Sequence, residues 1–159
     1  MKTLFTVFFI ISTAAIFPQR FLSLQGIENQ NGETILTYRL DDPSFSHKNI
    51  FKFNTTTGEE KLIMTDYFYQ LPGGWLAKTI LDYQFFPGDE DNFMNVGYEI
   101  NPDNHGFIAK NDTIVFGGMS NFEKVEISRQ NHNLVFVNYG SYGMMKSYDA
   151  GNTWSNDPI

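Results

Sequence analysis

The sequence contains no cysteine among its 159 residues. This absence excludes disulfide bonds, thiolate catalysis and zinc sites built on cysteine. The chain is also poor in basic residues, since 11 Lys and Arg stand against 18 Asp and Glu, which gives a formal net charge of −7. Nucleic-acid binding rests largely on neutralising phosphates, so we expect no nucleic-acid partner.

Helical periodicity is almost absent after the N-terminal stretch. Charged residues make up 18% and aromatic residues 16% of the chain, a mixture that is too apolar for a disordered protein. Apolar residues alternate or form short runs between Gly, Asn, Asp and Pro, which predicts an all-β fold. The segment 75–84 is compatible with a helix or a strand. Strands are expected at residues 34–40, 49–54, 61–64, 96–100, 106–109, 113–116, 123–128, 134–139 and 144–148.

The N-terminus has the order of a secretory signal peptide. Lys2 supplies a positive charge, an apolar stretch covers residues 4–11, and small residues follow at 12–15. The apolar run is shorter than the roughly 20 residues needed to span a bilayer. We therefore predict a signal peptide over residues 1–15, no integral membrane segment after its cleavage, and one domain over residues 16–159. The expected location is exported: secreted, periplasmic or at the cell surface.

The segment 147–154 reads S-Y-D-A-G-N-T-W and predicts a tight hairpin. Asp149 is placed to accept hydrogen bonds from backbone N–H groups of the turn. Gly151 is able to take a left-handed conformation without a Cβ clash. Trp154 provides a large apolar cover over the hairpin.

This segment resembles the Asp box, S/T-x-D-x-G-x-T-W/F, of sialidase-type and sortilin-type β-propellers. The five defined positions are matched by Ser147, Asp149, Gly151, Thr153 and Trp154. The resemblance implies a structural hairpin that lies away from any catalytic face. The residues from 125 to 147 also resemble the approach to such a box: a strand, an Asn-rich turn, a strongly apolar second strand and a third strand that enters the box.

Blade length limits the size of the expected propeller. One blade takes about 40–50 residues, so the chain after the signal peptide corresponds to about three blades. The sequence also stops at Ile159, where the fourth strand of a blade is expected. We therefore expect an incomplete propeller, and the alternative is a β-sandwich that carries one Asp box.

A sialidase requires three arginines that hold the substrate carboxylate, together with a Tyr–Glu nucleophile pair and an acidic residue. This chain has three arginines in all, Arg20, Arg39 and Arg129. Only Arg39, in Tyr38-Arg39-Leu40, resembles an arginine element of sialidases. A strand arginine on the solvent face explains it as well, so the catalytic residues remain unknown.

The remaining residue patterns predict neither a cofactor site nor a metal site. His47, His105 and His132 are isolated, which argues against a zinc site. The acidic stretch 89–92 could offer oxygen ligands to Ca²⁺, but its spacing is more typical of a solvated turn. A final group of aromatic residues is compatible with a sugar-stacking platform, although a β-sheet core is favoured. These aromatic residues are Tyr67, Phe68, Tyr69, Trp75, Tyr139 and Tyr142.

The sequence thus favours an exported Asp-box propeller-type protein or fragment with a non-catalytic role in surface binding or assembly. Its ligand would be an unknown protein or glycan. The alternative is a fragment of a sialidase-like or other Asp-box glycoside hydrolase whose catalytic residues lie mostly outside this chain. A third hypothesis is an exported sandwich module that binds a partner through an edge strand.

Overall fold

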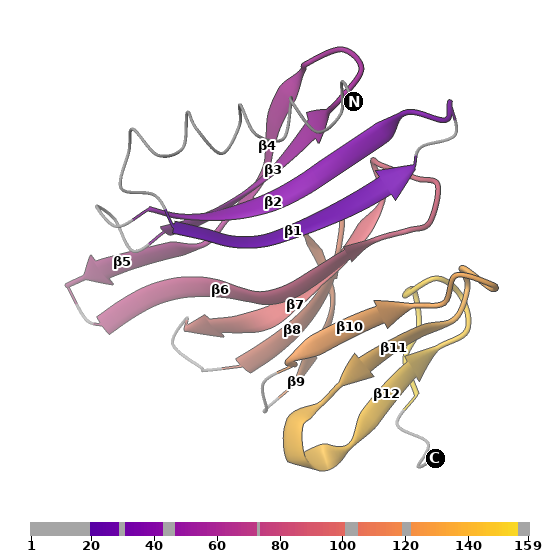
Figure 1. The fold of residues 1–159 in the computed structure, drawn as a ribbon. Helices are drawn as coiled ribbons and strands as arrows, with labels where there is room; N and C mark the ends of the chain where they lie inside the picture. Colours follow the sequence, from indigo (N-terminus) through magenta and orange to yellow (C-terminus); the bar gives the residue numbers. More distant parts are fainter. Residues whose placement is uncertain are drawn as a thin grey trace. The chain divides into compact units, whose positions relative to one another are not determined.

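The structure is a computed structural model that describes residues 20–28, 31–42, 47–72, 74–100, 105–118 and 122–155. Within these residues the chain forms strands β1 to β12 and one short 3₁₀ helix, so the all-β prediction is confirmed (Figure 1). The strands form three antiparallel sheets. The chain divides into two compact units, residues 1–67 and 68–159, and each is described by itself.

The first unit contains a four-stranded sheet in the order β1-β2-β3-β4. Its strands are β1 (Arg20–Glu28), β2 (Thr34–Asp42), β3 (His47–Asn54) and β4 (Glu60–Thr65). The strands predicted at 49–54 and 61–64 correspond to β3 and β4, which form a hairpin, and Gly58 in its turn has a φ of +76°. Strand β1 was not among the predicted strands.

Both faces of this sheet carry buried side chains. Tyr38 and Phe53 belong to a cluster on one face, where the Tyr38 and Phe51 rings stack with centroids 5.5 Å apart. Ile35 and Ile50 lie on the other face and are also buried.

The second unit begins with a five-stranded sheet in the order β5-β6-β7-β8-β9. The strands are β5 (Tyr67–Leu71), β6 (Gly74–Phe85), β7 (Phe93–Ile100), β8 (His105–Lys110) and β9 (Thr113–Gly118). The ambiguous segment 75–84 is therefore a strand. Strand β5 was not predicted.

A three-stranded sheet completes the second unit, in the order β10-β11-β12. It consists of β10 (Lys124–Ile127), β11 (Val135–Asn138) and β12 (Met144–Ser147), with the 3₁₀ helix η1 (Gly140–Tyr142) between the last two strands. All three sheets follow the order of the chain, so each one is a meander of hairpins (Figure 1).

One apolar core joins the two sheets of the second unit. Each fully buried aliphatic or aromatic side chain in it contributes about 1.5–3 kcal/mol relative to exposure, so the core dominates the stability of this unit. The part of the unit up to β8 supplies Phe86, Met94, Val96 and Ile108, and the part from residue 122 onward supplies Phe122, Val125, Ile127, Val135, Val137 and Met145.

Side chains of β6 also cap the edge strand of the three-stranded sheet. The backbone N–H of Val125 donates to the Asp82 carboxylate at 3.1 Å, and that of Ile127 donates to Gln84 Oε1 at 2.5 Å. An edge strand leaves N–H groups without partners, and here two of them are satisfied from the neighbouring sheet. Burial is the main cause that raises the pKa of Asp82, and it outweighs the N–H of Val125, which lowers that pKa.

Candidate functional site

The turn from Ser147 to Trp154 is organised around the carboxylate of Asp149. Its Oδ1 accepts the backbone N–H groups of Asn152 at 3.0 Å and Thr153 at 2.8 Å. Its Oδ2 accepts the hydroxyl of Thr153 at 2.6 Å. The sequence pattern predicts backbone N–H donors for this Asp, and the Thr153 hydroxyl is a further donor; together they close the turn on itself.

Ser147 completes this network from the buried end of β12. Its hydroxyl donates to Asp149 Oδ1 at 2.8 Å and accepts the backbone N–H of Gly151 at 2.8 Å. The pKa of Asp149 is lowered to about 2. The two largest causes are the hydroxyl and the backbone N–H of Thr153, and the Ser147 hydroxyl also contributes to this lowering. Asp149 is therefore ionised at neutral pH and held by its own turn.

Gly151 and Trp154 fix the shape of the hairpin. Gly151 has a φ of +84°, a left-handed conformation that favours glycine. A Cβ atom at this position would lie 2.8 Å from the side-chain sulfur of Met94. The indole N–H of Trp154 donates to the carbonyl of Gly151 at 3.1 Å, and its ring packs against the core of the unit.

Lys110 ties the hairpin to the five-stranded sheet. Its ammonium group donates to the carbonyl of Ala150 at 3.0 Å and to Asn152 Oδ1 at 3.4 Å. The same group lies 5.6 Å from the centre of the Phe86 ring, within range of a cation–π interaction. The sequence prediction missed Lys110 and Met94, because both lie more than one strand away along the chain from the segment they contact.

This arrangement limits what the hairpin can do chemically. A general base works best with a pKa near the operating pH, whereas the pKa of Asp149 is about 2. The Ser147 side chain is buried, and its hydroxyl donates a hydrogen bond to the Asp149 carboxylate. This carboxylate is too weak a base to take the serine proton and so to activate the hydroxyl as a nucleophile. The geometry therefore serves to hold a loop on a sheet.

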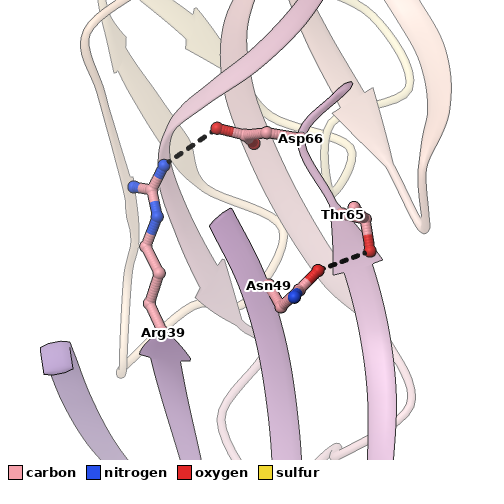
Figure 2. A network of polar contacts seen from close by, with 4 residues as sticks. All are labelled: Arg39, Asn49, Thr65 and Asp66. Carbon is pink, nitrogen blue, oxygen red and sulfur yellow. Dashed lines mark hydrogen bonds and ion pairs between the residues drawn. The ribbon is translucent and has the colours of Figure 1, made fainter. Parts of the chain in front are cut away.

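Arg39 lies in a different setting from the one expected. Its guanidinium is 3.3 Å from a carboxylate oxygen of Asp66, and the two side chains are 11% and 6% exposed (Figure 2). Thr65 donates its hydroxyl to Asn49 beside this pair. The interpretation of Arg39 as a solvent-facing strand residue is therefore wrong, because the buried Asp66 draws the guanidinium inward.

The other arginines do not join Arg39 in an observed cluster. Arg129 is exposed in the turn after β10, in the second unit. The side chain of Arg20 lies outside the described residues. Within the described part of the first unit, the structure therefore gives Arg39 an acidic partner and no arginine triad.

The candidate metal ligands remain scattered over the described residues. His105 lies 3.7 Å from the Glu99 carboxylate, His132 is exposed, and the side chain of His47 is not described. Asp89 accepts the N–H groups of Asp91 and Asn92, so it organises its own loop. No group of three or more His, Asp or Glu side chains in the described segments is arranged to hold a metal ion.

Only part of the candidate aromatic platform lies in the described residues. The rings of Tyr139 and Tyr142 lie in contact, with centroids 5.1 Å apart. Tyr67 is half-buried at the end of the first unit. The side chains of the remaining three candidates, Phe68, Tyr69 and Trp75, lie outside the described residues.

Comparison with known proteins identified no relative: no family model, no curated protein and no solved structure matches this chain. The predicted signal peptide, residues 1–15, lies outside the described residues. Among the residues that are described, no helix has the length and apolar character needed to cross a bilayer.

Proposed function

We propose that this chain is an exported Asp-box protein of the β-propeller type with a non-catalytic role in surface binding or assembly. The observation that carries the proposal is that the polar side chains of the hairpin from Ser147 to Trp154 form hydrogen bonds within the protein. Asp149 and Ser147 form hydrogen bonds within the turn, and Lys110 connects the turn to the next sheet. Residues that form such internal hydrogen bonds stabilise the fold, so a ligand is expected to bind at another surface.

The propeller-type architecture is supported by the order of the strands. Each sheet is a meander in chain order, and the second unit packs two consecutive meanders on one core. Blades of a propeller are such meanders, whereas immunoglobulin-type sandwiches connect their sheets by Greek-key crossovers. An experimental structure with the three sheets arranged radially about one axis is the expected result. Two sheets facing each other without a common axis would instead select the sandwich alternative.

Export is supported by the signal-like N-terminus and is tested by the N-terminal residue of the mature protein. The expected product, recovered from the medium or the cell envelope, begins at Ala15 or Ile16, as read by mass spectrometry of its N-terminal peptide. Recovery of a chain that still begins at Met1 from the cytosol would contradict this part of the proposal.

The non-catalytic role is tested against the glycoside-hydrolase alternative. Purified protein is incubated with a fluorogenic sialoside and with a panel of chromogenic glycosides, and we expect no release of the reporter group. Arg39→Lys serves as the matched variant, because it keeps the positive charge beside Asp66 but loses the planar fork of the guanidinium. Turnover by the natural chain that is abolished in Arg39→Lys would select the hydrolase alternative.

A further inference from the structure

The three-stranded sheet of the second unit has one buried face and one open face. Its strands β10, β11 and β12 lie side by side, and burial alternates along each of them (Figure 1). Successive side chains of a strand point to opposite faces, so the buried residues, such as Val125 and Val137, face the core. The residues between them are exposed or half-buried and form what we name the outer face. These are Lys124, Glu126, Phe136, Asn138, Met144 and Lys146.

The pairing register arranges the outer face in rows across the sheet. Glu126 is opposite Phe136, which is in turn opposite Lys146, so an acidic, an aromatic and a basic side chain lie in one row. Neighbouring strands are about 4.8 Å apart, so the two charges lie about 10 Å from each other on either side of the ring. Neither charged side chain forms a hydrogen bond or an ion pair with any other described residue. A second row contains Lys124, Asn138 and Met144.

The first row is complementary to a second copy of itself. A half-turn about an axis parallel to β11 exchanges the positions of β10 and β12. It therefore places Glu126 of each copy opposite Lys146 of the other, and the two Phe136 rings face each other at the centre. In the second row, Lys124 meets Met144 of the other copy, so no two like charges are opposed. Sheets that pack face to face keep their strands within about 30° of each other, which suits this axis.

We propose that the outer face binds a second copy of this chain and forms a two-fold dimer. Two-fold symmetry is the commonest arrangement of homo-oligomers, and it requires a patch that is its own complement. A partner with charge of a single sign would repel Glu126 or Lys146, whereas a second copy satisfies both. Three strands of four residues cover a small area, so the contact belongs to the weak class, with a dissociation constant in the micromolar range or above. The inference rests on the proposed assembly role and names the partner.

The test is sedimentation velocity of the mature full chain over a concentration series that reaches the millimolar range, and we expect a monomer–dimer equilibrium. Lys146→Glu is expected to weaken the dimer about tenfold or more, because each dimer contains the Glu126–Lys146 pair twice and the change makes both pairs repulsive. Lys124→Glu is the matched control. It makes the same change in net charge on the same face, but it lies opposite Met144 and should dimerise as the natural chain does. Circular dichroism and thermal unfolding establish that the variants fold.

An equimolar mixture of Glu126→Lys and Lys146→Glu tests the geometry, because each chain then carries the charges that complement the other. The mixture should form a heterodimer at least as tight as the natural dimer, although each variant alone is largely monomeric. A natural chain that stays monomeric, or a Lys124→Glu variant weakened as much as Lys146→Glu, would overturn the outer face as a dimer contact and leave the non-catalytic role standing. That role fails by a different result, turnover of the glycosides, which is measured separately from association.

Discussion

Two aspartates of the second unit accept backbone N–H groups, yet their pKa values shift in opposite directions. Asp149, in the hairpin, accepts two backbone N–H groups and two hydroxyls, and its pKa falls to about 2. Asp82, on β6, accepts the N–H of Val125 in a partly buried place, and its pKa is raised mainly by burial. The difference is burial, which dominates at Asp82, together with the larger number of donors that compensate the charge of Asp149.

This contrast distinguishes two uses of a carboxylate in a β protein. Asp149 is an anion that its turn requires, because four donors point at it and would lose their acceptor without it. Asp82 accepts the backbone N–H groups of Val125 and Tyr83, and its negative charge is a cost of placing the acceptor in a partly buried position. The predictions below separate these two roles, from the largest expected effect to the smallest.

Asp149→Ala is expected to have the largest effect, because it leaves the turn donors of Asn152 and Thr153 without an acceptor. The midpoint of thermal unfolding falls, and the amide protons of these two residues exchange rapidly in hydrogen-exchange NMR. Asn133→Ala, an exposed change in the neighbouring turn, is the control and is expected to have little effect. Unchanged protection at both amides in Asp149→Ala would remove the structural role assigned to this Asp.

Gly151→Ala is expected to destabilise the second unit by about 2–4 kcal/mol, through left-handed strain together with the contact on Met94. Gly88→Ala is the matched control, since Gly88 has a φ of +75° and a Cβ atom added there would meet nothing within 4 Å beyond its chain neighbours. That control isolates the backbone strain and is expected to cost about 1–2 kcal/mol. Chemical denaturation measures both, and equal costs would show that Met94 does not fix the hairpin.

Lys110→Met is expected to destabilise the same unit by about 1–2 kcal/mol. The change keeps most of the apolar stem but removes the hydrogen bonds to Ala150 and Asn152. Lys124→Met, at an exposed position of β10, is the control and should shift the stability by less than about 0.5 kcal/mol. Identical unfolding curves for the two variants would show that Lys110 does not couple the hairpin to the five-stranded sheet.

Asp82→Asn is expected to have the smallest effect, from neutral to about 1 kcal/mol of stabilisation at pH 7. Asparagine keeps an oxygen for the N–H of Val125 and removes a partly buried charge. Asp82→Ala, which removes the acceptor as well, should cost about 1–3 kcal/mol. Chemical denaturation compares them, and a large loss of stability in Asp82→Asn would mean that the charge itself is required.

The sequence predicts the hairpin better than its surroundings, for a physical reason. Ser147, Asp149, Gly151 and Thr153 act on one another within a single turn, so their pattern carries the geometry. The contacts with Lys110 and Met94 depend on how sheets pack, and no local pattern encodes them. Arg39 shows the same limit, since its partner Asp66 is separated from it by two strands and two turns.

The strands follow the same rule. Segments with clear alternation or strong apolar runs, such as those that became β3 and β11, are identified from periodicity alone. The segment 75–84 places apolar residues at both helical and strand spacing, and only its pairing with β7 makes it a strand. Strands β1 and β5 are not identified from periodicity, so their pairing partners decide their structure.

The most direct test of the account is a carbon-13 NMR titration of the side-chain carboxylates of Asp149 and Asp82 in the mature chain. The hairpin donors stabilise the anion, so Asp149 should titrate at about 2, and its contribution to stability should be lost as the pH falls from about 4 through this value. Burial disfavours the anion of Asp82, so this residue should titrate above the usual 3.8, and its ionisation should weaken the fold as the pH rises. Ordinary pKa values at both positions would contradict the claim that Asp149 is the anion on which the hairpin is built.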